Sequence, residues 1–266
     1  MERITSAKNE LIKGLKALRE RKGRQEAGRF LVEGEVMIRE ALKCGLAVRE
    51  AVAEESHGAL AEELAALGAR ACLVPRSLLE SVSDTRTPQG ICAAFDLPVP
   101  LPLDRAPARI VALDGTQDPG NVGTIWRTAD AAGFSGLLFG SGCADPLSPK
   151  VQRAAMGSGF RVPFMAAEDL PETLAALKAR GWSVIASDLK GHDFYSRPDP
   201  GERFVLVIGN EARGISQAVR DQASMLVKLP MRGGAESLNA AVAAGIMMYE
   251  LCREIGPAGE AGEAAL

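Results

Sequence analysis

Apolar runs alternate with stretches of helical periodicity along the chain. In its first part, short apolar runs at 30–32, 47–53, 71–74 and 91–95 are separated by amphipathic stretches, each of which ends near a glycine or a polar turn. A basic stretch over 5–25 precedes these runs, and we expect it to form one helix. The pattern predicts a small α/β unit.

The same alternation resumes at Arg109 and continues to residue 256. It predicts six mostly apolar strands separated by helices, and the strands lie within 109–113, 136–140, 162–165, 182–188, 203–209 and 225–230. Such a pattern is typical of a parallel sheet covered on both faces. Sheets of this kind bind ligands beyond the carboxyl ends of their strands. Residues 257–266 are rich in Gly, Ala and Glu, and we expect them to form a frayed tail.

A proline-rich segment separates the two patterns. Pro98, Pro100, Pro102 and Pro107 follow one another closely, and repeated proline blocks a helix and favours a stiff, extended connector. A chain of 266 residues also exceeds the usual size of a single domain. We therefore predict an N-terminal domain over 1–97, a linker over 98–108, a second domain over 109–256 and the tail.

Composition narrows the class of protein. Apolar residues make up 47% of the chain and charged residues 24%, which is typical of a globular protein. No apolar run approaches the roughly 18 residues that span a bilayer, and the first ten residues lack the apolar stretch of a signal peptide. We therefore expect a cytoplasmic protein with no membrane partner.

The cysteine and histidine content argues against metal chemistry and against a histidine base. The five cysteines are scattered, odd in number and never arranged as Cys-x-x-Cys, which indicates reduced, mostly buried thiols and no metal site. His57 and His192 are the only histidines, and for each of them an ordinary surface role is favoured over catalysis.

Charge is distributed unevenly along the chain. The net charge of −3 alone would argue against a nucleic-acid partner, but residues 1–29 hold nine Lys or Arg against four Glu. This asymmetry suggests a basic arm that binds a polyanion. A solvated helix face would have the same composition, and the charge pattern alone leaves both interpretations open.

Residues 113–130, LDGTQDPGNVGTIWRTAD, combine a strand end, a glycine turn and the start of a helix. Such an arrangement usually binds a phosphate. However, the glycine spacing is not GxGxxG, no acidic residue ends the next strand and no GK[ST] occurs, which excludes the two common nucleotide-binding loops. We expect Asn121 to cap the helix and Arg127, about one and a half turns further on, to reach a phosphate or hydroxyl at the turn. The alternative is a structural turn with Arg127 as a surface charge.

Two further polar turns follow predicted strands. In 204–214, FVLVIGNEARG, Glu211 follows the strand end, where substrates bind in parallel sheets, although it could also cap the next helix. In 228–250, a Gly-Gly loop leads to Ser237, a good cap for a long helix of small residues, and to Asn239. Both side chains could simply be capping groups. The three turns together bring amides, an arginine, a carboxylate and a hydroxyl to one edge of the sheet.

These turns resemble the motifs of the SpoU (TrmH) family of RNA ribose 2′-O-methyltransferases. The matching segments are NVGTIWRTA at 121–129, VIGNEARG at 207–214 and LPMRGGAESLNAAVA at 229–243, in the family's order. Residues 28–42, GRFLVEGEVMIREAL, are similar to the family's substrate-binding extension, a small ribosomal-protein-L30e-like α/β domain. The resemblance covers nearly the whole chain.

The resemblance implies a fold, an activity and a set of site residues. It implies a deep trefoil knot in the C-terminal domain, a rare exception to unknotted chains, a homodimer formed through this domain, and methyl transfer from S-adenosylmethionine (SAM) to a ribose 2′-hydroxyl, with no metal. The cofactor would contact Leu189, Gly209, Leu229, Met231 and Leu238. The catalytic set would be Asn121, Arg127, Glu211, Ser237 and Asn239.

RNA phosphates would be bound by basic residues outside the three motifs. These residues are Arg19, Arg21, Lys22, Arg24, Arg29, Lys150 and Arg153. Ala155 stands where many family members have a serine, which weakens the expectation for Lys150 and Arg153. Ribosomal RNA is the favoured substrate, because this type of N-terminal domain accompanies ribosomal substrates more often. Transfer RNA is the alternative substrate, and a non-catalytic RNA-binding or assembly factor is the alternative function.

Arg127 is expected to orient the substrate rather than to act as a base. The sulfonium methyl of SAM is already electrophilic, so the enzyme mainly aligns the 2′-hydroxyl and helps to remove one proton. A guanidinium stays protonated in proteins, and we therefore expect Arg127 to hold a phosphate or the 2′-oxygen. For the neighbouring Trp126, core packing is favoured over stacking on a base.

Overall fold

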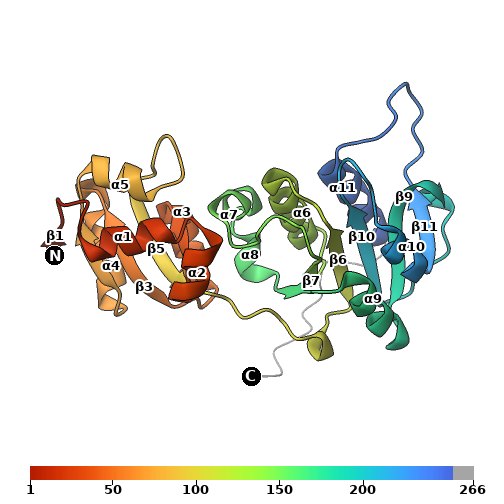
Figure 1. The fold of residues 1–266 in the computed structure, drawn as a ribbon, viewed down its shortest axis with the longest axis horizontal. Coiled ribbons are helices and arrows are strands. Elements are labelled where there is room, and N and C mark those ends of the chain that lie inside the picture. The colour runs from red at the N-terminus through yellow and green to blue at the C-terminus, as the bar shows by residue number, and fades with distance from the viewer. Residues whose placement is uncertain (254–266) are drawn as a thin grey trace. The chain divides into compact units, whose positions relative to one another are not determined.

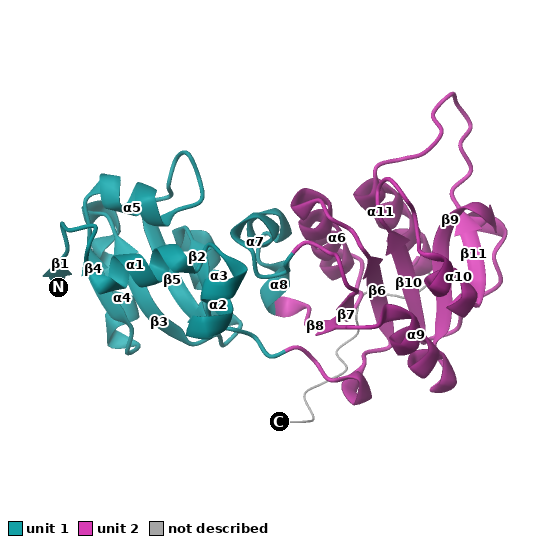
Figure 2. Ribbon diagram, viewed as in Figure 1, with its two compact units in different colours: residues 1–99, 145–160 teal, residues 100–144, 161–266 magenta. Residues whose placement is uncertain are grey.

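The computed structural model describes residues 1–253, so the predicted tail lies outside the described residues. The chain forms two compact units (Figure 2): the first contains residues 1–99 and 145–160, and the second contains residues 100–144 and the chain from residue 161 onward. The first change of unit lies inside the proline-rich segment. Residues 145–160 belong to the first unit, although the sequence pattern assigns them to the second domain.

Residues 145–160 join the first unit through apolar and charged contacts. The ring of Phe160 lies 6.1 Å from the ring of Phe30, which belongs to the core of the first unit. Arg153 forms an ion pair with Asp84 at 3.0 Å. Periodicity cannot reveal this assignment, because it depends on contacts between segments that are far apart in the sequence.

The first unit is a five-stranded mixed sheet with helices on both faces (Figure 1). Its strands lie in the order β1-β4-β3-β5-β2, in which β5 runs antiparallel to β2 and β3 and the other pairs are parallel. The strands are β1 Glu2–Arg3, β2 Arg29–Glu33, β3 Val48–Ala53, β4 Arg70–Leu73 and β5 Ile91–Asp96. The helices are α1 Glu10–Ala17, α2 Arg21–Ala27, α3 Glu35–Lys43, η1 Glu55–His57, α4 Gly58–Ala66, α5 Arg76–Val82 and α7 Pro149–Ala155. The four predicted strands are confirmed as β2 to β5, whereas β1 is too short to show a period.

Side chains that alternate along these strands form two cores, one on each face of the sheet. Leu31 and Ala94 pack with residues of α1 and α5. Phe30 and Phe95, their neighbours in sequence, pack with residues of α3 and α4. Because both faces are covered, the strands have almost continuous apolar sequences.

The predicted single helix over 5–25 is wrong, because this segment forms two helices, α1 and α2. Glu20 adopts an extended conformation just before α2, and α2 packs against α1. A Cβ atom on Gly23 would lie 2.0 Å from the carbonyl oxygen of Ala17. The close approach of the two helices therefore requires a glycine at this position.

The second unit is a six-stranded parallel sheet in the order β11-β9-β10-β6-β7-β8. The strands are β6 Arg109–Asp114, β7 Gly136–Phe139, β8 Phe164–Ala166, β9 Ser183–Asp193, β10 Phe204–Gly209 and β11 Met225–Lys228. The helices are η2 Leu103–Arg105, α6 Pro119–Ala131, α9 Leu170–Ala179, η3 Phe194–Ser196, α10 Gln217–Gln222 and α11 Ala240–Leu251, and α8 Ser158–Arg161 spans the second change of unit. The predicted parallel sheet and all six of its strands are confirmed. Within residues 1–253 no helix is long and apolar enough to cross a membrane.

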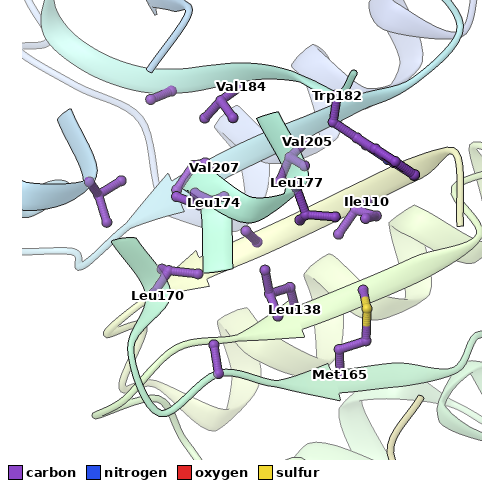
Figure 3. Close-up of a cluster of buried hydrophobic side chains, with 14 of the residues drawn as sticks. Ile110, Leu138, Met165, Leu170, Leu174, Leu177, Trp182, Val184, Val205 and Val207 are labelled. Atoms are coloured by element: carbon purple, nitrogen blue, oxygen red, sulfur yellow. The ribbon is translucent and has the colours of Figure 1, made fainter. Parts of the chain in front are cut away.

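Helices cover both faces of this sheet. Leu174 and Leu177 of α9 pack against a buried cluster on one face that includes Val205 of β10 (Figure 3). On the other face Trp126 of α6 is fully buried, and its ring lies 5.4 Å from the ring of Phe139. The Trp126 Nε1–H group donates to the carbonyl oxygen of Val162 at 3.0 Å. The expected core role of Trp126 is therefore confirmed.

The predicted linker is held against the second unit over most of its length. The backbone N–H of Leu101 donates to the carbonyl oxygen of Phe164 at 2.8 Å. Arg180 donates to the carbonyl oxygens of Leu103 and Asp104 at 2.7 and 3.1 Å. Leu101 and Leu103 also pack against the buried cluster of α9. Proline content predicts the extended backbone but not these contacts.

Candidate active site

The loops after β6 and β10 are joined by hydrogen bonds at the carboxyl edge of the sheet. Asp114, the last residue of β6, accepts the backbone N–H of Ser216 through Oδ2 at 2.6 Å. Asn210, directly after β10, donates from Nδ2 to the carbonyl oxygen of Gly115 at 2.8 Å. Gly115 has a φ of +67°, a left-handed conformation that favours glycine. The first two motifs therefore form one polar surface.

Asn121 does not cap α6, which corrects the prediction. The cap is Asp118, whose Oδ1 accepts the backbone N–H of Asn121 at 2.7 Å, and Pro119 occupies the first helical position. The side chain of Asn121 is therefore available for other contacts. Its Nδ2 donates to Oε1 of Glu211 at 3.0 Å, and its Oδ1 accepts from Nδ2 of Asn239 at 2.9 Å.

Of the two candidate caps, Asn239 caps α11 and Ser237 does not. Its Oδ1 accepts the backbone N–H groups of Ala241 and Val242 at 2.9 and 3.2 Å. The same side chain thus joins the N-terminus of α11 to Asn121. A series of hydrogen bonds runs from the third motif through the first to the second.

Glu211 ends this series of hydrogen bonds. Its Oε2 lies 3.5 Å from the backbone nitrogen of Gln117, so both carboxylate oxygens face the first motif. The alternative role for Glu211, capping the next helix, is filled by Ser216, whose Oγ accepts from the backbone N–H of Val219. Glu211 is therefore held as a hydrogen-bond acceptor at the edge of the sheet.

The remaining two predicted catalytic residues, Arg127 and Ser237, are not part of the series. Arg127 is exposed on α6, and among residues 1–253 it forms no hydrogen bond or ion pair. Ser237 is exposed in the loop before α11, and its hydroxyl has no hydrogen-bond partner in the same part of the chain. Both side chains remain available for a ligand.

A cavity of about 680 Å³ opens between residues 187–190 of β9 and the loops after β10 and β11. All five predicted cofactor residues line it: Leu189, Gly209, Leu229, Met231 and Leu238. Glu211, Ser237 and Asn239 line it as well, whereas Asn121 and Arg127 do not. The volume is in the range of small-molecule sites.

One wall of the cavity is a bulge in β9, residues 187–191, which we call the β9 bulge. The pairing of β9 with β11 passes from Ala186–Leu226 directly to His192–Val227, so the intervening residues leave the ladder. A Cβ atom on Gly191 would lie 2.5 Å from the backbone nitrogen of Val227. Only glycine lets the strand return to its partner so closely.

Two charged residues of this wall, Asp188 in the β9 bulge and Arg220 in α10, were missed by sequence reasoning. They form an ion pair. Asp188 ends the apolar run 182–188, the same signal that singles out Glu211, and could have been found by it. Arg220 lies inside a helix and has no such signal.

The cysteine at this edge, Cys143, is held as a structural thiol. The Cys143 thiol lies beside the end of β6 and donates to the carbonyl oxygen of Leu113 at 3.2 Å. Burial raises the pKa of Cys143 above its usual value, so the group is a neutral thiol at neutral pH. Within residues 1–253 no group of three or more His, Cys, Asp or Glu side chains could hold a metal ion.

Sequence profiles of known families match two parts of the chain. The profile of the SpoU rRNA Methylase family matches residues 108–249, and that of the MRM3-like substrate binding domain matches residues 9–93. The chain belongs to the SpoU rRNA methylase family. The resemblance of the three motifs and the predicted class of enzyme, an RNA methyltransferase, are thereby confirmed.

Individual SpoU-family proteins resemble the chain over most of its length. The 23S rRNA (guanosine(2553)-2′-O)-methyltransferase RlmP of Bacillus subtilis is 36% identical over 252 residues, which cover 94% of this chain and 99% of that protein. The AdoMet-bound rRNA methyltransferase from Sinorhizobium meliloti has a TM-score of 0.87 at 33% identity, with 96% of this chain and 98% of that chain covered. The SpoU methyltransferase AviRb from Streptomyces viridochromogenes, also in complex with AdoMet, has a TM-score of 0.82 at 32% identity, with 92% and 98% covered.

Arg24 of this SpoU-family chain is a structural residue, which corrects its predicted role as a phosphate ligand. Its side chain is buried, with 3% of the residue exposed. The guanidinium donates to the carbonyl oxygens of Leu18 and Arg19, both at 2.8 Å, and pairs with Asp145. Its donors are used inside the first unit and cannot reach RNA.

The other predicted phosphate ligands differ in their availability. Arg19 and Arg153 share the carboxylate of Asp84, at 3.3 and 3.0 Å. Arg29 pairs with Glu50 at 3.0 Å. The exposed cations of the set are Arg19, Arg21, Lys22 and Lys150, of which Lys22 lies 3.8 Å from Glu26.

Proposed function

We propose that this SpoU-family chain transfers a methyl group from SAM to a ribose 2′-hydroxyl of ribosomal RNA. The observation that carries the proposal is the series Asn239–Asn121–Glu211, which joins all three motifs beside the cavity. A relative that is similar over 94% of the chain is named a 23S rRNA 2′-O-methyltransferase, which favours ribosomal RNA over transfer RNA.

The cavity suits SAM in size and in chemistry. Leu189, Leu229, Met231 and Leu238 give it apolar surface for an adenine ring, and two similar solved structures are AdoMet complexes. When bound, SAM supplies an electrophilic methyl group. The protein must then add alignment of the hydroxyl and removal of one proton.

The side chains of the hydrogen-bonded series orient the substrate hydroxyl in this proposal. Asn121 fixes the Glu211 carboxylate, which accepts a hydrogen bond from the 2′-hydroxyl. Ser237 binds a second RNA oxygen with its unpaired hydroxyl. Arg127 holds an RNA phosphate or the 2′-oxygen from the exposed face of α6, a role that suits a permanently protonated guanidinium.

A homodimer formed through the second unit is part of the proposal. α11 exposes Val242, Ile246 and Tyr249, with exposed fractions of 52%, 38% and 57%. Their spacing places them in one apolar stripe on the helix. A second copy of the chain would cover this stripe.

Two finer features of the fold also belong to the proposal. The loop between β11 and α11 lines the same cavity as the β9 bulge and the loop after β10, an arrangement that supports a trefoil knot. The match of residues 9–93 to a substrate-binding domain supports a ribosomal-protein-L30e-like first unit that binds RNA through Arg19, Arg21 and Lys22.

The test is methylation of unmodified ribosomal and transfer RNA with labelled SAM, followed by mapping of the modified nucleotide. We expect label on a ribose of ribosomal RNA. Glu211→Ala should abolish it, whereas Glu202→Ala, an exposed glutamate before the other end of β10, should not. Label on a base would contradict the mechanism, and label on transfer RNA alone would contradict the substrate. SAM binding without transfer to either RNA would favour a non-catalytic RNA-binding factor.

A further inference from the structure

The β9 bulge is held in place by a buried carboxylate. The side chain of Asp188 is only 5% exposed. Its Oδ1 accepts the backbone N–H of Lys190 at 2.7 Å, which closes a turn around Leu189. Its Oδ2 pairs with Nη2 of Arg220. Both oxygens therefore act on the segment that presents Leu189 to the cavity.

Arg220 reaches the β9 bulge from a helix that is anchored elsewhere. α10 begins just after Ser216, whose backbone N–H is bound by Asp114 at the end of β6. The Arg220 side chain is 30% exposed, against 5% for Asp188. The ion pair thus ties the bulge to α10. Because Asp188 is the more deeply buried partner, it depends on Arg220 more than Arg220 depends on it.

The unequal burial determines what the loss of each partner does. Without Arg220, the Asp188 carboxylate would be buried without a counter-ion, which is costly. The bulge would then rearrange to bring the carboxylate to water, and Leu189 would move with it. Without the Asp188 charge, Arg220 is exposed enough to be solvated, and an asparagine at position 188 still accepts from Lys190.

We propose that Asp188 and Arg220 are positioning residues for the cofactor, because their ion pair holds the β9 bulge in the shape that binds SAM. The inference rests on the proposed function, in which the cavity is the SAM site. It assigns no contact between either residue and the reacting atoms. The other carboxylate of the cavity wall, Glu211, is engaged with Asn121, so it cannot replace Asp188 as the partner of Arg220.

The test is the affinity of the full-length protein for SAM, measured by calorimetry. Arg220→Met should raise Kd about tenfold or more, because it leaves Asp188 buried and unpaired. Asp188→Asn should have a smaller effect. The double variant should bind SAM nearly as well as Asp188→Asn, since no unpaired charge remains. If Arg220 instead contacted the cofactor directly, adding Asp188→Asn to Arg220→Met would not restore SAM binding.

Two further measurements distinguish a positioning role from a role in catalysis and from direct recognition of the sulfonium charge. Turnover at saturating SAM should stay within about twofold of wild type in all three variants, because only binding changes. Kd for S-adenosylhomocysteine, which lacks the sulfonium charge, should rise by the same factor as Kd for SAM. A matched control is the ion pair of Arg161 with Asp130 at 2.6 Å, outside the cavity, where Arg161→Met should leave Kd unchanged.

The outcomes distinguish this inference from the function on which it rests. Wild-type protein that binds no SAM would overturn both. Wild-type binding with an unchanged Kd in Arg220→Met, or a double variant that is worse than Arg220→Met alone, would overturn the positioning role only.

Discussion

At the scale of single residues, the hydrogen bonds of the site fix the orientation of its two side-chain amides, Asn239 and Asn121. Oδ1 of Asn239 is used by the N-terminus of α11, so its Nδ2 must face Asn121. Asn121 then presents its oxygen to Asn239 and its Nδ2 to Glu211. At the other end of the series, the ionised Glu211 carboxylate can only accept hydrogen bonds. It therefore also requires Asn121 to turn its Nδ2 toward Glu211 and its oxygen toward Asn239.

Asn239→Asp tests this direction without removing the helix cap. Aspartate keeps the cap and adds a negative charge, which is favourable at a helix N-terminus. However, it opposes the oxygen of Asn121 with a second acceptor. We expect turnover to fall by about tenfold or more and the melting temperature to be unchanged or higher. Asn9→Asp, the same substitution at the cap of α1, should leave turnover unchanged, and wild-type turnover in Asn239→Asp would contradict the role of the series.

The position of these polar residues at one edge of the sheet could be predicted from the sequence, but the choice of the residue that caps each helix could not. Asp118 and Asn121 in the first turn, and Ser237 and Asn239 in the third, are all good caps. Each turn therefore offers two candidates, and the backbone conformation decides between them. The difference matters for the site. Because Asp118 caps α6, the side chain of Asn121 is available to bind Glu211.

Arg127→Lys tests whether Arg127 acts through its geometry. Lysine keeps the charge but loses the planar fork that binds a phosphate or hydroxyl in two places. We expect turnover to fall by about tenfold or more, with Kd for SAM unchanged because Arg127 does not line the cavity. Near-normal turnover in single-turnover assays would refute the geometric role.

At the scale of elements, strand positions follow from apolar runs, but irregularities do not. The run 182–188 predicts β9, yet β9 continues to Asp193 after the β9 bulge. The bulge depends on pairing with β11, some forty residues further along the chain, which no local period reports. The break between α1 and α2 is also missed by local periodicity, because it depends on the packing of the two helices against each other.

Gly191→Ala tests the closure of the β9 bulge. The added methyl would lie 2.5 Å from the backbone of Val227, so either strand must shift. We expect a lower melting temperature and a higher Kd for SAM. The matched control is Gly14→Ala in α1, where no atom lies within 4 Å, and alanine there should stabilise the protein by about 0.5–1 kcal/mol. Equal effects of the two substitutions on SAM binding would contradict the role of Gly191.

Ile246→Glu tests the proposed interface on α11. A carboxylate in the middle of the apolar stripe would have to be desolvated in a dimer, so we expect the variant to be monomeric by light scattering where the wild type is dimeric. Val36→Glu on α3, a position that is 76% exposed in the first unit, should not change the mass. A monomeric wild-type protein would refute the interface.

At the scale of the whole molecule, both α/β units and the division near residue 99 could be predicted from periodicity and proline content. The assignment of residues 145–160 to the first unit could not, because it depends on the packing of Phe160 against Phe30. The basic arm was recognised by its charge, but its burial was not. Leu11, Ile12 and Leu15 of α1 belong to the core of the first unit.

The burial of α1 decides how the RNA-binding role of the arm can be tested. Deletion of residues 1–25 would remove core side chains, so a loss of binding could report unfolding. Arg21→Gln with Lys22→Gln removes two exposed charges and keeps the core. Each lost phosphate contact lowers the slope of log K against log salt by about 0.7–0.9. We expect weaker RNA binding, a slope reduced by up to about 1.8, and an unchanged Kd for SAM. The matched control is Lys178→Gln, at an exposed lysine of α9 in the second unit, which should leave the slope unchanged. Equal slopes for the double variant and the wild type would show that Arg21 and Lys22 do not contact RNA phosphates.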